Sequence, residues 1–260
     1  VAPSRGLGDV YKRQILMILL YVPPVQNFIR KQATAIASDA TGMNISVERI
    51  DLRFPLNLLV RGVEVIQQPD TLLSLESLNV RVQAWPLLKG KVEVDDVTLS
   101  QVAVNSADLI EGMQIKGVLG RFFLQSHGVD LSNETAVVNR AELSDTHIQL
   151  LMNDTTTTPK DTTASAPVNW KVDLHQLKLK NISFDMQLPA DSLKMAAYIG
   201  EATVDGAKAD LKNQFYGLRQ FLLSGASASY DTGEADPAEG FDASHMAVRN
   251  IRIGLDSLLY

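Results

Sequence analysis

The sequence predicts a mainly β protein built as one elongated, bent sheet. Short runs alternate apolar with polar residues, turn-forming residues separate these runs, and the chain is rich in Val, Leu and Ile with only 6% aromatic residues. Successive side chains of a strand point to opposite sides, so alternation of period two indicates strands with one apolar face. This composition favours ordered β structure over disorder.

Charge and cysteine content exclude some classes of function. The 260 residues carry a formal net charge of −6, which argues against a nucleic-acid-binding protein that relies on phosphate neutralisation. The chain has no cysteine, so disulfides and thiolate metal sites are excluded, although the cellular compartment is left open.

The N-terminal region is expected to contain three segments before the sheet. Residues 1–14 include SRGLGDVYKRQ, which looks like the in-frame translation of a sequencing-library adapter and is set aside as an artefact. Residues 15–23 hold an apolar run of eight residues, too short to span a bilayer, and we interpret it as the end of a truncated transmembrane anchor. A buried segment of a soluble protein and a secretory signal core are the alternatives. Residues 24–42 predict an amphipathic helix, which could cap the first strands or lie on a membrane.

One pattern then recurs, apolar-x-apolar-x-x-apolar-x-apolar. Its one-residue slip would move the apolar side chains to the other face unless a bulge or bend absorbs the extra residue. Bends at matching positions would turn a flat sheet into a trough, whereas ordinary packing of two sheets explains the pattern almost as well. The six matches are Ile45, Val47, Ile50, Leu52; Leu58, Val60, Val63, Val65; Leu73, Leu75, Leu78, Val80; Val97, Leu99, Val102, Val104; Leu177, Leu179, Ile182, Phe184; and Met246, Val248, Ile251, Ile253.

A corner motif joins two of the alternating runs, Leu78–Val82 and Val92–Val104. Proline lacks a backbone donor and glycine tolerates positive φ, so the chain can turn there, while the large apolar side chains can cover the end of the sheet. The motif consists of Trp85, Pro86, Leu87, Leu88 and Gly90.

This strand–corner–strand unit, with W-P-L-L-K-G-K followed by V-x-V-D-D-V-x-L-x-x-V-x-V, resembles the AsmA-like family and, within it, the TamB group of translocation and assembly module subunits. The resemblance is sharp only over Val80–Val104 and otherwise follows the pattern over residues 15 to 260. It implies an inner-membrane anchor, a periplasmic β-groove of the β-taco type, phospholipid as cargo and an Omp85-type outer-membrane barrel as partner.

The remaining chain is expected to complete two β units. Residues 43–152 form the first unit, residues 153–167 a flexible Thr-rich loop, and residues 168–260 a second unit truncated at its C-terminus. Residues 168–188 predict two strands, and His127-Gly128 predicts a turn. Residues 209–222 fit both a helical and an alternating period, and the family resemblance favours a strand.

No catalytic, cofactor or metal site is predicted. The four histidines have no zinc-binding spacing, and Asp242, Ser244 and His245 are interpreted as turn and surface residues rather than a catalytic set. For Asp95 and Asp96, one side chain is expected to face outward and the other to sit at a bend. The protein is therefore not expected to be an enzyme.

The functional element predicted by the sequence is a surface, namely a hydrophobic groove lined by alternating apolar residues. The candidate lining residues are Val80, Val82, Val92, Val94, Leu99, Val102 and Val104. Plain core packing explains any single one of them as well. The function expected from the resemblance is phospholipid transfer towards the outer membrane or assembly of outer-membrane proteins. A structural, adhesin-like β-sandwich without lipid is the alternative.

Overall fold

A computed structural model describes the structure over most of the sheet-forming chain. The described residues are 27, 31, 34, 35, 38, 39, 41–54, 56–83, 94–110, 112–130, 134–153, 169–233 and 244–259. The predicted anchor, the corner motif and most of the Thr-rich loop lie outside these residues. Within the predicted helix, residues 27, 31, 34, 35, 38, 39 and 41 are described and are helical, and Gly42 lies in a turn.

The described chain is mainly β-strand and forms one open sheet, which confirms the prediction of a mainly β fold. One short 3-10 helix spans Pro189–Asp191. The strands are β1 (Asn44–Arg53), β2 (Asn57–Gln67), β3 (Asp70–Val82), β4 (Val94–Asn105), β5 (Met113–Asp130), β6 (Thr135–Met152), β7 (Lys171–Leu188), β8 (Leu193–Asp210), β9 (Phe215–Asp231), β10 (His245–Leu255) and β11 (Leu258–Leu259).

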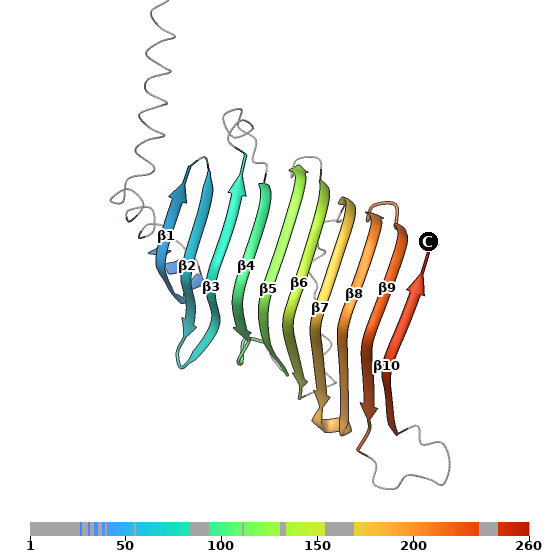
Figure 1. Ribbon diagram of the computed structural model, residues 1–260. Helices are drawn as coiled ribbons and strands as arrows, with labels where there is room; N and C mark the ends of the chain where they lie inside the picture. Colours follow the sequence, from blue (N-terminus) through green and yellow to red (C-terminus); the bar gives the residue numbers. More distant parts are fainter. Residues whose placement is uncertain are drawn as a thin grey trace, which may run out of the picture.

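All strands belong to one open sheet, in which β1 to β10 follow one another in sequence order (Figure 1). Every neighbouring pair is antiparallel except β6 and β7, which are parallel. The short β11 pairs with β9 beyond the end of β10, so it continues the track of that strand. The two predicted β units are thus parts of a single sheet, and the parallel pair coincides with the predicted loop between them.

The slip in the apolar pattern lies inside the strands and at the same level in each. For example, the pairs Val47–Val63 and Arg49–Arg61 enclose Glu48 and Gly62, and the same relation continues from strand to strand as far as β8. Between β8, β9 and β10 the register is irregular at this level, and the left-handed residues Gly225 and Asn250 mark it. We call this row the crease. Its members are Glu48, Gly62, Glu76, Gln101, Gly120, Asp145, Asn181, Gly200, Gly225 and Asn250.

Left-handed backbone conformations mark the crease. Within the crease, positive φ occurs in β2, β4, β6, β7, β9 and β10, at Gly62, Gln101, Asp145, Asn181, Gly225 and Asn250. From β1 to β6 only one strand of each antiparallel pair carries such a residue, whereas both strands of the parallel pair do. A left-handed residue breaks the two-residue alternation, so the apolar side chains stay on one face on both sides of the crease. The strands bend at about their middle (Figure 1).

Two local predictions were wrong. Residues 171–188 form the single strand β7 rather than two strands, because Asn181 absorbs the slip without ending the strand. His127-Gly128 lies within β5 rather than in a turn, where the register with β6 shifts around Ser126. In the ambiguous region 209–222, the strand prediction is confirmed for the end of β8 and the first half of β9, which a turn joins.

Candidate functional site

The sheet has one face made of unbroken apolar rows, which we call the apolar face. Residues directly opposite one another on paired strands point to the same side of the sheet, so the register identifies each row. Three rows cross all ten strands. The first contains Ile45, Val65, Leu73, Val104, Gly117, Ile148, Phe184, Ala197, Ala228 and Val248. The second contains Ile50, Val60, Leu78, Leu99, Phe122, Leu143, Leu179, Ala202, Leu223 and Ile253. The third contains Leu52, Leu58, Val80, Val97, Leu124, Ala141, Leu177, Val204, Phe221 and Leu255.

The apolar face is only partly shielded from water. Among the described residues, no large side chain is fully buried, and the buried hydrophobic positions are few and include small residues such as Ala141 and Ala202. Members of the first row remain substantially exposed, with Val104 at 41%, Ile148 at 38% and Val248 at 57%. Closed two-sheet cores bury such side chains almost completely. The described part of the chain instead presents a broad apolar surface.

The predicted lining residues fall on this face wherever the structure describes them. Val80 lies in the third row, Leu99 in the second and Val104 in the first, while Val102 pairs with Leu75 on the same side. Val82, two residues beyond Val80 on β3, pairs with Val94. Val92 and the whole corner motif, Trp85, Pro86, Leu87, Leu88 and Gly90, lie outside the described residues.

The two aspartates at the start of β4 differ in environment because the strand is irregular there. The register shifts between Arg81 and Val82, so Asp95 is the extra residue, and its Oδ1 accepts a 2.6 Å hydrogen bond from the Gln83 amide. Asp96 is buried, and its Oδ2 lies 3.3 Å from Nε of Arg81. Both carboxylates therefore have structural partners.

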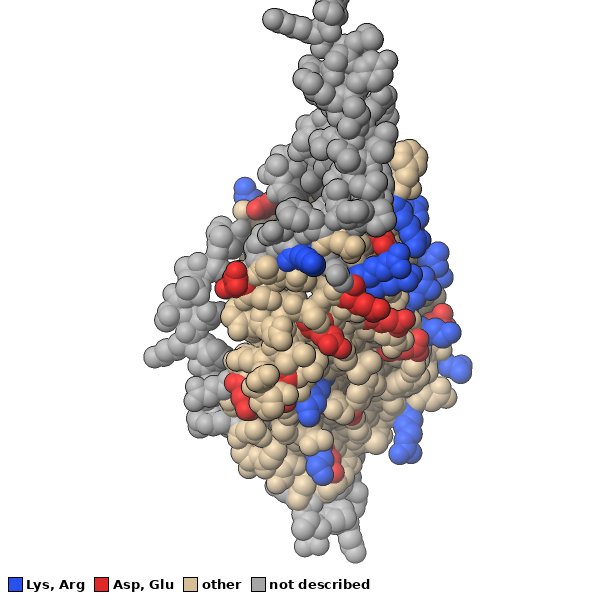
Figure 2. Space-filling view, turned by 90° about the vertical axis from the view of Figure 1, so that its left-hand side faces the viewer, with Lys and Arg blue, Asp and Glu red and all other residues tan. Residues whose placement is uncertain are grey.

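The opposite face carries the charged residues and is called the polar face. Basic side chains gather on the right-hand side of the view in Figure 2. Cross-strand and same-strand ion pairs occur on this face, including Arg49 Nε to Asp51 Oδ1 at 2.7 Å and Lys208 Nζ to Asp173 Oδ2 at 3.5 Å. The sheet thus separates a charged side from a side suited to apolar ligands.

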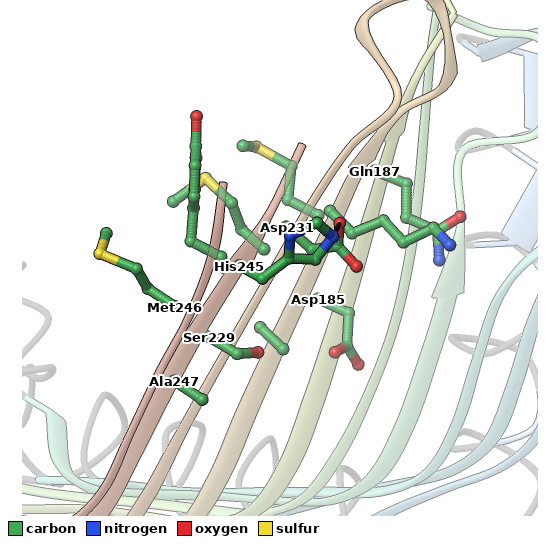
Figure 3. A pocket seen from close by; sticks show the side chains of 12 residues that line it. Asp185, Gln187, Ser229, Asp231, His245, Met246 and Ala247 are labelled. Atoms are coloured by element: carbon green, nitrogen blue, oxygen red, sulfur yellow. Dashed lines mark ion pairs between the residues drawn. The ribbon is translucent and has the colours of Figure 1, made fainter. Parts of the chain in front are cut away.

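A shallow cavity of about 440 Å³ lies at the end of β7 to β10. Figure 3 shows Asp185, Asp231 and His245 pointing to one side of the strands and Met246 to the other. His245 Nε2 lies 3.3 Å from Asp231 Oδ1, so its carboxylate partner comes from β9. Asp242, which the sequence places near His245, lies outside the described residues.

Sequence reasoning missed a Ser–His–Asp contact on the polar face. His147 Nδ1 lies 2.6 Å from Ser183 Oγ, and its Nε2 lies 3.5 Å from Asp185 Oδ2. The serine and aspartate are two residues apart on β7, and the histidine pairs with the serine from β6. The backbone around them belongs to the β6–β7 and β7–β8 ladders, so it is not arranged to stabilise an oxyanion. We interpret the contact as a cross-strand structural pair.

At the opposite end of the strands, the neighbours of Asp210 shift the pKa of its carboxyl group. Burial acts to raise its pKa, but hydrogen bonds from the backbone N–H and side-chain amide of Asn213, together with the Lys171 ammonium 3.2 Å away, outweigh this effect. The pKa of Asp210 therefore lies below its ordinary value. These contacts tie the turn after β8 to the start of β7.

Metal and membrane-helix signals are absent from the described part of the chain. There, no group of three or more His, Asp or Glu side chains is placed to hold a metal ion. Within the same residues, no helix has the length and apolar character needed to cross a membrane.

Comparison with known proteins adds no family assignment. No protein-family model and no curated protein matches this chain.

Proposed function

We propose that the apolar face is the lining of a hydrophobic groove that carries phospholipid acyl chains. The single observation that supports this function is the continuity of the apolar rows across all ten strands, on both sides of the crease. This surface would shield an acyl chain from water. Each methylene buried against it would stabilise the bound lipid by about 0.8 kcal/mol. Such a role needs an unbroken lining and no catalytic residue.

The dimensions of the sheet agree with this proposal. Neighbouring strands lie about 4.8 Å apart, so ten strands extend about 45 Å across the sheet. This exceeds the roughly 30 Å thickness of the hydrocarbon core of a bilayer. An acyl chain placed across the strands would therefore contact apolar side chains along its whole length.

The family resemblance supplies the proposed cellular context. An AsmA-like or TamB-like protein would be anchored in the bacterial inner membrane by one transmembrane helix, with its β-groove in the periplasm. It would support outer-membrane biogenesis, by phospholipid transfer or together with an Omp85-type barrel in protein assembly. The groove and the β-taco shape are part of this proposal.

Mass spectrometry of lipids that co-purify with the chain tests the proposal. A variant with Val82→Asp, Val94→Asp and Val102→Asp places carboxylates on the apolar face of β3 and β4. Charges there raise the cost of holding an acyl chain because they would have to be desolvated. We expect stoichiometric phospholipid on the wild type and little on this variant.

A control variant places the same charges on the polar face of the same strands, at Ser74→Asp, Thr98→Asp and Ala103→Asp. It should keep its lipid, and circular dichroism should show that both variants are folded. A folded wild type without phospholipid would contradict the proposal and favour a purely structural module. Equal lipid loss in both variants would show that the apolar face is not the binding surface.

A further inference from the structure

One part of the polar face carries an excess of positive charge, although the whole chain has a formal net charge of −6 (Figure 2). Three rows, which begin on β1 at Arg49, Asp51 and Arg53, cross this face between the crease and the turn that joins β1 to β2. From β1 to β6, every exposed charged side chain in these rows is an arginine. We call the six arginines the basic patch: Arg49, Arg53, Arg61, Arg81, Arg121 and Arg140.

The carboxylates in the same rows are less exposed than the arginines and neutralise only half of them. From β1 to β6 these carboxylates are Asp51 and Asp96, which are buried, and Glu142, which is half-buried. Each forms an ion pair with one arginine of the patch, so three arginines have no ion pair with any described residue. The paired arginines are Arg49, Arg81 and Arg140, and the unpaired ones are Arg53, Arg61 and Arg121.

The basic patch is broad rather than a pocket for one small anion. Six neighbouring strands at a spacing of about 4.8 Å extend roughly 24 Å across the sheet, and the four residues from Arg49 to Arg53 extend roughly 14 Å along it. The crease, with the exposed acidic residues Glu48, Glu76 and Asp145, bounds the patch on one side. A surface of this size fits an extended partner that carries many negative charges.

An exposed aromatic residue lies at the other boundary of the patch. Phe54 follows Arg53 in the turn after β1 and is 85% exposed. Arginine binds phosphate oxygens through two parallel hydrogen bonds, and aromatic rings are favoured at the interface between bilayer headgroups and acyl chains. A nucleic acid lying over the arginines would also supply phosphates, but Phe54 lies beyond the rows, where bases above the patch would not stack on it. Phosphate and an apolar layer behind it occur together at a bilayer surface.

We infer that the basic patch docks the sheet onto the surface of an anionic phospholipid bilayer, with Phe54 at the level of the headgroups. Basic side chains are attracted to anionic lipid within about a Debye length of the surface. The patch lies on the face opposite the apolar rows, so this docking does not require a lipid bound to the apolar face.

Flotation of the full chain with vesicles tests the docking. Vesicles of phosphatidylcholine alone are compared with vesicles of equal parts phosphatidylglycerol and phosphatidylcholine. The wild type should bind the anionic vesicles roughly tenfold or more tightly than the neutral ones. Raising the salt concentration from about 0.1 M to about 1 M should remove this preference, because the Debye length falls from about 10 Å to about 3 Å. Phe54→Ala should weaken binding to the anionic vesicles several-fold, and unchanged binding would overturn the placement of Phe54.

A triple variant, Arg53→Glu, Arg61→Glu and Arg121→Glu, reverses the unpaired charges and breaks no ion pair between described residues. It should lose the preference for anionic vesicles. The matched control changes the net charge by the same amount at exposed basic residues of the polar face on the other side of the crease, and it should keep the preference. Its substitutions are Lys116→Glu, Lys194→Glu and Arg249→Glu.

Equal binding of the wild type to both kinds of vesicle overturns the inference, and so does an equal loss of preference in both triple variants. Binding of duplex DNA that the patch variant abolishes, without a preference for anionic vesicles, also overturns it and assigns the patch to nucleic acid. Circular dichroism identifies an unfolded variant, and glutamine then replaces glutamate at the same three positions. The lipid proposed for the apolar face is measured separately by mass spectrometry, so the two proposals fail independently.

Discussion

Close contacts at the crease show how single residues shape the sheet. A Cβ atom at Gly120 would lie 2.7 Å from Cβ of Asp145 and 2.9 Å from its carbonyl oxygen. These neighbours are main-chain or first side-chain atoms, so they cannot move away as the end of a flexible side chain could. Gly120 is therefore required by the close approach of β5 and β6 at the bend.

We expect Gly120→Ala to lower the free energy of unfolding by roughly 1–3 kcal/mol, because it forces the two strands apart. Urea unfolding followed by circular dichroism measures this change. Gly254→Ala is the control, since a Cβ there would lie 3.6 Å from Leu222 Cδ2, an ordinary contact. Equal stability of the two variants would show that the crease tolerates an added methyl group.

Asp210 makes a pH-dependent contribution to stability. Its folded-state pKa is lowered, so its stabilisation is present above the unfolded-state pKa of about 3.9 and is lost as pH falls through the folded-state pKa. Asp210→Asn should therefore be less stable than the wild type at neutral pH, and the difference should shrink in acid. Chemical unfolding at several pH values measures it, and a difference that does not change with pH would contradict the assignment.

At the scale of the strand, the crease explains why the apolar face is continuous. Gln101 adopts a left-handed conformation, φ 50°, between the apolar pairs of β4. Deleting it would bring Val97, Leu99, Val102 and Val104 into strict alternation, but it would shift one half of β4 by one residue against β3 and β5. The apolar side chains of that half would then lie opposite the polar-face residues of the neighbouring strands.

Deletion of Gln101 should therefore lower the free energy of unfolding by about 2 kcal/mol or more, from the loss of apolar burial at two positions. Gln101→Asn is the matched control, because asparagine adopts the left-handed conformation more readily than most residues. Thermal unfolding compares the two variants. A deletion variant as stable as the control would mean that the slip does not determine on which face of the sheet the apolar side chains of β4 lie.

The same pattern also shows what the sequence could not predict. Alternation and the slip predicted strands, one apolar face and the bend, because these depend on residues close in sequence. The pattern is symmetric along its length, so it carries no information on strand direction, and the parallel pairing of β6 with β7 could not be read from it. The contact of His147 with Ser183 was missed for a related reason. It depends on the register between two strands, and the two residues are 36 positions apart in the sequence.

At the scale of the whole molecule, the sheet combines a charged side with a broad apolar side, and the described residues form no second sheet that covers it. The position of the described candidate residues on the apolar face could be predicted, because each of them belongs to a strand whose pattern is clear. The extent of the face could not, because it requires the register of ten strands. What matters for the proposed function is this extent rather than any single residue.

Photo-crosslinking at neighbouring residues on opposite faces tests the central proposal most directly. Leu99 lies on the apolar face, and Thr98 lies next to it on the polar face of the same strand. A photoreactive amino acid at each position, irradiated with the folded protein in phospholipid vesicles, should give a lipid adduct at position 99 and little at position 98. Equal labelling at both positions, or labelling only at 98, would contradict a lipid-binding role for the apolar face.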